Sequence, residues 1–142
     1  MKKILIVNGP NLNLLGKREP EIYGNVTLDE IHDYLKEEAE KRDAEIEWLQ
    51  SNYEGEIIEK LQTAGEKYDG IIINPAALSY TSYGILDALL ALELPVLEVH
   101  LSNIFSREEF RSHSVTASAC IGMIAGLGWK SYLYALLYLL EI

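Results

Sequence analysis

Short apolar runs alternate along the chain with stretches in which apolar residues recur every three or four positions. Residues 4–7 are a continuous apolar run and residues 70–74 contain three consecutive isoleucines, as expected of strands that are buried on both faces of a sheet. The pattern predicts five strands, at residues 4–7, 45–48, 70–74, 96–101 and 121–125. It predicts helices at residues 28–42, 57–64, 82–92 and 129–140. Strands that alternate with helices indicate an α/β fold with a five-stranded parallel sheet covered on both faces.

Two segments have the residue spacing of a helix start. Thr27 and Glu30 form the capping-box pattern, in which each side chain satisfies the backbone N–H of the other residue. Ser106 and Glu109 have the same spacing, which predicts a short helical turn. Arg107 and Arg111 would then lie on one face of this turn, four residues apart.

The predicted last helix is apolar nearly all round. Its large apolar residues are Trp129, Tyr132, Leu133, Tyr134, Leu136, Leu137, Tyr138, Leu139 and Leu140. They cannot all face the core of one domain, and an apolar patch of that size on a monomer would be an association site. The pattern therefore predicts a homo-oligomer.

In parallel sheets of this kind, ligands bind in the crevice beyond the carboxyl ends of the strands. That rule selects residues 8–24, 74–82 and 100–113 and the turn after Ser51. A small-molecule site is expected where these segments meet.

Length and composition limit the number of domains, the partners and the location that can be expected. The 142 residues predict one domain, residues 1–142, and the 49% hydrophobic and 24% charged content is that of an ordinary globular protein. A net charge of −10 argues against nucleic acid or an anionic membrane surface as a partner. No apolar run is long enough to span a bilayer, and the single Cys120 fits a reducing compartment, so we expect a cytoplasmic protein.

The arginines are unevenly placed in this acidic chain. Arg42 ends a predicted helix, whereas Arg18, Arg107 and Arg111 fall in or beside predicted loops. Guanidinium groups gathered at loops can form an anion site, because Arg binds carboxylates through two hydrogen bonds. Surface ion pairs with neighbours such as Glu108 are an equally good reading of composition alone.

The connection formed by residues 8–24 is unusually long for a loop between a strand and a helix, and such loops are usually lids or binding loops. It lacks the glycine spacing of a phosphate loop or a dinucleotide-binding loop. It does contain Arg18 and Tyr23, five residues apart. A guanidinium stabilises a tyrosinate, which is the form that can act as a base, but for such a pair in an arbitrary loop surface packing is the better explanation.

The other segments offer further candidates, each with a structural alternative. Ser79, Thr81 and Ser82 precede a helix and can either cap it or help to hold an anion. Glu98 and His100 lie on the same side of a strand, where a histidine is more often structural than catalytic. Arg107 and Arg111 could clamp a carboxylate or pair with neighbouring glutamates.

No metal site is predicted. His32, His100 and His113 are scattered along the chain, and His32 is expected to be a solvated helix residue. Cys120 is expected to be a small buried apolar residue. A serine-hydrolase elbow has no support, because the Gly-x-Ser-x-Gly pattern is absent from the sequence.

Taken together, the segments resemble type II 3-dehydroquinate dehydratases over nearly the whole chain. The matching strings are NGPNLNLLGKREPEIYG at 8–24, QSNYEGEII at 50–58, EVHLSNIFSREEFRSHS at 98–114 and GLGWKSYLYAL at 126–136. The resemblance implies a flavodoxin-like three-layer fold and a dodecamer built from trimers. It also implies that no metal or organic cofactor is needed. The implied reaction is the hydro-lyase step from 3-dehydroquinate, a carboxylated cyclic substrate, to 3-dehydroshikimate in the shikimate pathway, without distinguishing a biosynthetic from a degradative role.

The resemblance also implies roles for residues. Tyr23, activated by Arg18, removes a proton from the carbon beside the ring ketone, and Asn11 holds a water that stabilises the resulting enolate. Glu98 orients His100, and Arg107 helps to order the first loop. Asp87 reaches into the site of a neighbouring subunit. The residues implied to bind the ring hydroxyls and the carboxylate are Asn74, His100, Leu101, Ser102, Asn103 and Arg111.

Two positions depart from the family pattern. Tyr80 stands where the family usually has the histidine that protonates the leaving hydroxyl, and Leu86 stands where it usually has an arginine. A phenol is a weaker acid than an imidazolium, so the expectations are a working, slowed dehydratase or a catalytically impaired relative that keeps assembly and ligand binding. A third candidate, a flavodoxin-like flavin binder, lacks the aromatic-flanked phosphate loop that it would need.

Overall fold

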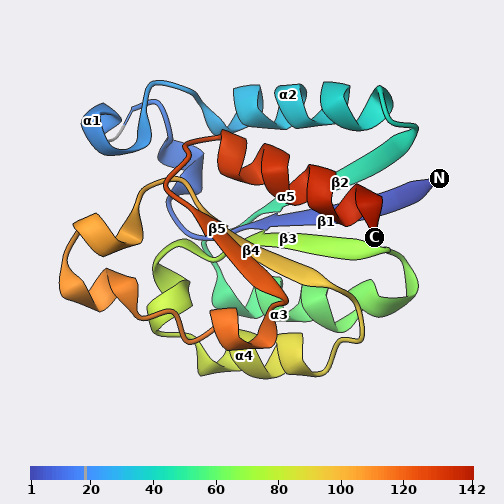
Figure 1. The fold of residues 1–142 in the computed structure, drawn as a ribbon. Coiled ribbons are helices and arrows are strands. Elements are labelled where there is room, and N and C mark those ends of the chain that lie inside the picture. Colours follow the sequence, from blue (N-terminus) through green and yellow to red (C-terminus); the bar gives the residue numbers. More distant parts are fainter. Residues whose placement is uncertain (18) are drawn as a thin grey trace.

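A computed structural model of the protein describes residues 1–17 and 19–142. Its centre is a five-stranded, all-parallel sheet in the order β2-β1-β3-β4-β5 (Figure 1). The strands are β1 (Lys2–Asn8), β2 (Ala44–Gln50), β3 (Gly70–Asn74), β4 (Val96–His100) and β5 (Gly122–Ala125). The five predicted strands and their parallel arrangement are confirmed. The strand order is that of flavodoxin-like folds, in which the chain changes direction across the sheet between β1 and β3.

Helices cover both faces of the sheet. The helices of at least eight residues are α2 (Leu28–Glu40), α3 (Glu54–Gln62), α4 (Tyr83–Leu90) and α5 (Lys130–Glu141). Helices α2 and α5 lie together on one face and α3 and α4 on the other (Figure 1). This three-layer arrangement confirms the predicted fold class.

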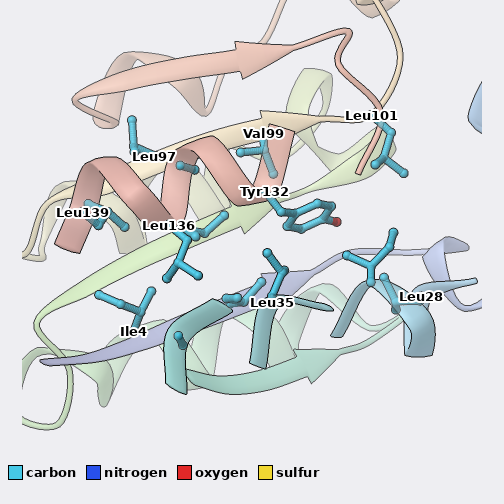
Figure 2. Packing of buried hydrophobic residues seen from close by; sticks show 14 of the residues in the cluster. Ile4, Leu28, Leu35, Leu97, Val99, Leu101, Tyr132, Leu136 and Leu139 are labelled. Carbon is cyan, nitrogen blue, oxygen red and sulfur yellow. The ribbon is translucent and has the colours of Figure 1, made fainter. Parts of the chain in front are cut away.

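Two apolar cores result from the alternation of side chains along the buried strands. Ile4 and Ile6 point into the core under α2 and α5, whereas Leu5 and Val7 point into the core under α3 and α4. All four side chains are fully buried. Figure 2 shows the first core, in which Tyr132 of α5 lies among aliphatic residues from β1, β4 and α2.

The capping box at the start of α2 is present: the Thr27 hydroxyl accepts from the Glu30 N–H at 3.2 Å, and the Glu30 carboxylate accepts from the Thr27 N–H at 3.3 Å. Ser82 caps α4 by accepting from the Ile85 N–H at 2.9 Å. For Ser82, capping rather than anion binding is therefore the role that the structure records.

The capping box predicted at Ser106 is wrong. The segment forms two separate 3-10 turns, Ile104–Ser106 and Glu109–Ser112, and the Ser106 hydroxyl donates back to the Asn103 carbonyl at 2.9 Å. Asn103 starts the first turn through its own side chain, which accepts from the Phe105 N–H. Arg107 lies between the turns in extended backbone, so Arg107 and Arg111 do not share a helical face.

The long first connection contains two short elements, the 3-10 turn Leu12–Leu14 and the helix α1 (Pro20–Tyr23). Arg18 lies outside the described residues. The remaining 3-10 turns are Ala64–Glu66, Ala76–Tyr80 and Ala117–Ala119. No helix among residues 1–17 and 19–142 combines the length and the apolarity needed to cross a membrane.

Helix α5 buries one face completely and leaves part of its apolar surface outside. Tyr132, Ala135, Leu136 and Leu139 are buried, whereas Tyr134 and Tyr138 are 45% and 50% exposed. The helix is thus not enclosed by its own chain, as the sequence pattern predicts, and its outer aromatic side chains are accessible to a partner.

Candidate active site

A cavity of about 260 Å³ opens at the carboxyl ends of β1, β3 and β4. Its walls come from the connection after β1, the turn after β3 and the segment after β4, three of the four regions that the crevice rule selects. Among the lining residues are Asn11, Tyr23, Asn74, Tyr80, His100, Leu101, Ser102, Arg107 and Arg111. An apolar wall of Leu12, Leu14, Leu15 and Ile104 adjoins these polar groups.

Of the described residues to which the family resemblance assigns a role, three do not line the cavity. Glu98 lies behind His100, and Asn103 belongs to the turn that follows Ser102. Asp87 is an exposed residue of α4 on the outside of its own chain. Asp87 could therefore contribute only to the cavity of another copy of the chain.

Tyr23 ends α1 at the mouth of the cavity, and its hydroxyl accepts a hydrogen bond of 2.7 Å from Nη1 of Arg107. The guanidinium also lies 5.1 Å from the centre of the Tyr23 ring. Because 84 positions separate the two residues, sequence spacing could not reveal this pairing. Tyr23 also packs partly against the first core, which the sequence did not indicate.

Tyr80, which also lines the cavity, has a similar arrangement. Its hydroxyl accepts from Nη1 of Arg111 at 3.1 Å, and its ring packs edge-to-face on Phe110 with 5.3 Å between centres. The same guanidinium donates from Nε to Glu108 at 3.2 Å. Arg111 is thus shared between a phenol and a carboxylate. The pairing of Arg111 with Glu108 is confirmed, whereas the binding of a ligand carboxylate by Arg111, which lines the cavity, stays a prediction.

The charges around Arg111 keep it cationic. Burial lowers the pKa of the guanidinium, but the hydrogen bond to Glu108 and the nearby Tyr80 and Tyr23 outweigh this effect and raise the pKa. The hydrogen bond from Arg111 in turn lowers the pKa of Glu108. Together with Arg107, the cavity presents two permanent cations, which suits an anionic ligand.

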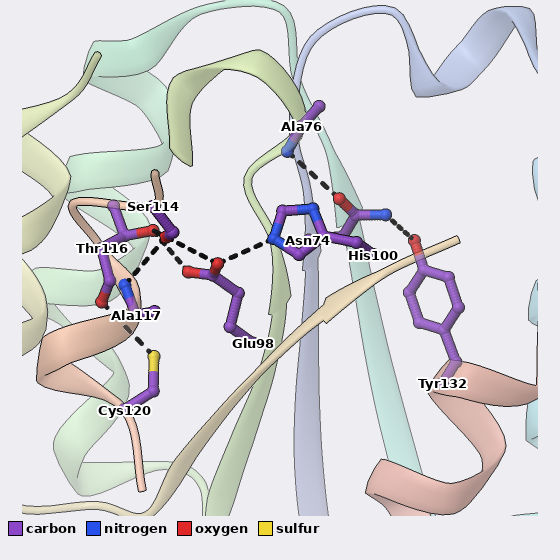
Figure 3. Close-up of polar contacts among 9 residues, drawn as sticks. All are labelled: Asn74, Ala76, Glu98, His100, Ser114, Thr116, Ala117, Cys120 and Tyr132. Atoms are coloured by element: carbon purple, nitrogen blue, oxygen red, sulfur yellow. Dashed lines mark hydrogen bonds and ion pairs between the residues drawn. The ribbon is translucent and has the colours of Figure 1, made fainter. Parts of the chain in front are cut away.

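His100 is held by a buried carboxylate. Its Nε2 lies 2.7 Å from Oε2 of Glu98, as expected for residues on one side of a strand, and Glu98 is fully buried (Figure 3). The Ser114 hydroxyl donates to the same carboxylate at 2.7 Å, and Thr116 donates to its other oxygen. Sequence reasoning missed these two hydroxyls. Ser114 ends a string that matches the family, but nothing in the spacing links it to Glu98.

We expect Glu98→Ala to lower the free energy of unfolding by at least about 1–3 kcal/mol, the cost of leaving one buried polar group unsatisfied, because three side chains contact this carboxylate. The substitution leaves the imidazole and two hydroxyls without their common acceptor. Urea unfolding at fixed protein concentration measures the change. Glu45→Ala, at an exposed position of β2, is the matched control and should change stability by at most about 0.5 kcal/mol. Equal effects of the two substitutions would contradict this account of Glu98.

The floor of the cavity contains Asn74, whose carboxamide is held on both sides. Its nitrogen donates to the Tyr132 hydroxyl at 2.9 Å, and its oxygen accepts from the Ala76 N–H at 3.1 Å. The Tyr132 hydroxyl donates to Oδ1 of Asn8 at 2.6 Å. Burial raises the pKa of Tyr132, so this phenol stays neutral. The sequence pattern identified Tyr132 only as one of the apolar residues of the last helix.

The turn after Ser51 supports the first connection. The Asn52 side-chain oxygen accepts from the Asn11 N–H at 3.0 Å, and Gln50 bridges Asn52 and the Gly9 carbonyl. Gly9 runs directly against the next loop, because a β-carbon there would lie 2.4 Å from the Pro75 carbonyl oxygen. The string at residues 50–58 thus supports the string at residues 8–24, which forms one wall of the cavity.

Two expectations outside the cavity can also be compared with the structure. His32 is only partly solvated: it is of intermediate exposure and stacks on Trp48 at 4.7 Å between ring centres, and its pKa is lowered, mainly by partial burial. Cys120 packs against the second core as expected, and burial and the nearby Glu98 raise its pKa to about 12. Within residues 1–17 and 19–142, no three His, Cys, Asp or Glu side chains converge as metal ligands would.

Comparison with known proteins agrees with the geometry. The sequence pattern of the family described as Dehydroquinase class II matches residues 2–140. A 3-dehydroquinate dehydratase from Clostridium botulinum is 52% identical over 141 residues, which cover 99% of this chain and 96% of that protein. Crystal structures of type II dehydroquinases are also similar. The one from Butyrivibrio crossotus has a TM-score of 0.95 at 46% identity, with 97% of each chain covered. The one from Propionibacterium acnes has a TM-score of 0.97 at 43% identity and covers 100% of this chain and 98% of its own.

Proposed function

Because the chain belongs to the class II dehydroquinase family, we propose that it is a 3-dehydroquinate dehydratase, a hydro-lyase that converts 3-dehydroquinate to 3-dehydroshikimate. The observation that carries the proposal is the pair of phenols in one cavity, each with an arginine on its oxygen. An elimination needs one group that takes a proton and another that gives one. Tyr23 and Tyr80 supply both.

Tyr23 acts as the base. As tyrosinate it removes the proton from the carbon beside the ring ketone, and the electron pair of the C–H bond moves onto the carbonyl oxygen to form an enolate. The guanidinium of Arg107 donates a 2.7 Å hydrogen bond to the Tyr23 oxygen and so positions it at the cavity. Arg18, to which the family resemblance assigns the activation of Tyr23, would add a second cation. A water held by Asn11 donates to the enolate oxygen.

Tyr80 acts as the acid. Its oxygen accepts a hydrogen bond from Arg111, so its own hydrogen is available to another acceptor. When the enolate collapses, the C–O bond of the leaving hydroxyl breaks, and Tyr80 gives its proton to that oxygen, which departs as water. Proton exchange with solvent then restores the neutral Tyr80 and the ionised Tyr23.

The remaining polar residues hold the substrate. Arg111 contributes positive charge for the substrate carboxylate, and His100, Ser102 and Asn74, which line the cavity, contact its ring hydroxyls. The family resemblance adds the backbone of Asn103, which belongs to the turn after Ser102. Leu101 closes the cavity beside them. Glu98 fixes the ring of His100 from behind. No step of this scheme uses a metal or an organic cofactor.

We further propose that the protein is cytoplasmic and assembles through trimers, as the family resemblance implies, into a dodecamer. Asp87 lies on the outside of its own chain and would reach the site of a neighbouring subunit in such an assembly. The exposed apolar side chains of α4 and α5 support an assembly, since Leu90 is 62% exposed and Tyr138 is 50% exposed.

Light scattering of the purified protein at micromolar concentration should give the mass of three or of twelve chains. The physical reason is that α5 leaves apolar surface uncovered by its own chain. A clean monomer mass across a range of salt and protein concentrations would contradict the proposed assembly.

The proposed reaction is tested by mixing pure protein with 3-dehydroquinate and following the ultraviolet absorbance of the conjugated enone product. A second candidate, a member of the family that binds but does not turn over, is favoured by Tyr80, because a phenol is a poorer acid than imidazolium. Calorimetric titration with 3-dehydroquinate separates the two. Turnover supports the dehydratase, whereas saturable binding without product formation supports the impaired relative.

A further inference from the structure

Two buried asparagines end the neighbouring strands β1 and β3, and one phenol joins them. We propose that Tyr132 is a positioning residue that orients the Asn74 carboxamide so that its nitrogen offers one hydrogen to the bound substrate. The inference rests on the proposed function, since it concerns the same cavity and the same ligand. It adds a residue from the last helix to a site otherwise built from the ends of the strands.

The three residues meet at the centre of the fold. Asn8 and Asn74 are partners in the register between β1 and β3, where the chain changes direction across the sheet. The Tyr132 hydroxyl lies between their side chains, 2.6 Å from Oδ1 of Asn8 and 2.9 Å from Nδ2 of Asn74. Asn8 and Tyr132 are fully buried, and Asn74 is 2% exposed. Figure 3 shows Tyr132 reaching from α5 to Asn74.

Backbone groups fix which end of each carboxamide faces the phenol. The Ala76 N–H can be satisfied only by the oxygen of Asn74, at 3.1 Å, so Asn74 turns its nitrogen toward Tyr132. The Leu49 carbonyl can accept only from the nitrogen of Asn8, at 3.2 Å, so Asn8 turns its oxygen toward Tyr132. A hydroxyl both donates and accepts, and therefore satisfies both neighbours at once. Reversing either amide would leave a buried polar group unpaired.

The contact with Tyr132 determines how many hydrogens the Asn74 carboxamide can donate to the ligand. A carboxamide nitrogen carries two hydrogens, and Tyr132 receives one of them from Asn74. Asn74 lines the cavity, so the second hydrogen can be donated to a hydroxyl or carboxylate oxygen of the substrate. Without the Tyr132 hydroxyl, the carboxamide loses the contact that holds its nitrogen and is free to rotate about the single contact to Ala76.

The test is Tyr132→Phe, which keeps the ring in the core and removes only the oxygen. Because Asn74 contacts parts of the substrate that do not react, KM should rise roughly 10-fold while kcat changes by less than about 3-fold. Tyr68→Phe is the matched control. Tyr68 is also a buried core tyrosine, but its hydroxyl has no hydrogen-bond partner among the described residues, so neither constant should change.

A double-mutant cycle with Asn74→Ala shows whether Tyr132 acts through Asn74. If it does, Tyr132→Phe changes KM in the parent protein and leaves KM unaltered in the Asn74→Ala background. If Tyr132→Phe does not fold, Asn8→Ala replaces it in the cycle. Loss of the Asn8 acceptor frees the hydroxyl to rotate, and an increase in KM of about 3-fold, absent without Asn74, is expected.

The outcomes distinguish this inference from the proposed function. Additive effects of Tyr132→Phe and Asn74→Ala, or an unchanged KM in Tyr132→Phe, overturn the role of Tyr132 while the parent still turns over 3-dehydroquinate. If the parent protein binds 3-dehydroquinate without turnover, the same double-mutant cycle is measured with dissociation constants from calorimetric titration instead of KM. A parent protein that neither binds nor converts 3-dehydroquinate overturns the inference together with the function.

Discussion

Replacement of Tyr23 by phenylalanine is expected to lower kcat by roughly 100- to 10,000-fold, the usual cost of removing a positioned acid or base. Only the hydroxyl is lost, and its oxygen is the atom that accepts the 2.7 Å hydrogen bond from Arg107. The ring packs partly against the first core, so phenylalanine keeps that packing and the protein should remain folded. Steady-state kinetics and urea unfolding of parent and variant measure both expectations.

Tyr34→Phe is the control for this experiment. Tyr34 is a half-exposed residue of α2 that packs on Trp129, outside the cavity, and its substitution should leave kcat unchanged. Arg18→Ala should act in the same direction as Tyr23→Phe, because it removes a cation that favours tyrosinate. A Tyr23→Phe protein that turned over at the parent rate would show that Tyr23 is not the base.

Tyr80→His is expected to raise kcat, by roughly 10- to 100-fold, with a smaller effect on KM. Imidazolium protonates a leaving hydroxyl near neutral pH far better than a phenol does, and proton transfer contributes mainly in the transition state. The adjacent guanidinium of Arg111 would oppose a second positive charge, but the Glu108 carboxylate on the same guanidinium offsets part of that repulsion. The increase in kcat should therefore stay below the upper end of the range for a positioned acid, roughly 100- to 10,000-fold.

Kinetics of the parent, Tyr80→His and Tyr80→Phe across pH check this assignment. Tyr80→Phe should lower kcat, since it has no proton to give, whereas Tyr80→His should rise and acquire a new limb in its pH profile where imidazole titrates. A flat or reduced kcat for Tyr80→His at every pH would show that Tyr80 only packs against Phe110 at the wall of the cavity.

Most of the fold could be predicted because the spacing of apolar residues along the chain follows directly from which side chains are buried. The apolar run at residues 4–7 identified β1, and the alternation of Glu98 and His100 placed both side chains on one side of β4, where the structure has them 2.7 Å apart. The rule that ligands bind beyond the carboxyl ends of parallel strands selected the segments that line the cavity.

Other features of the site depend on contacts that no local pattern encodes. Arg107 meets Tyr23 across 84 positions and Tyr132 meets Asn8 across 124, so the fold must be known before either pair can be identified. The error at Ser106 is different in kind. The spacing was suitable for a cap, but Asn103, three residues earlier, starts the turn and takes the Ser106 hydroxyl as its donor.

The environment of Cys120 makes the only thiol of the chain a built-in reporter of structural opening. Thiol reagents react with the thiolate, and a pKa of about 12 leaves almost none of it at neutral pH. Reaction in the native state is therefore slow, although the side chain is only partly buried. Any opening that separates Cys120 from the second core and from Glu98 restores ordinary thiol reactivity. The rate of alkylation thus measures how often this part of the molecule opens, without an introduced label.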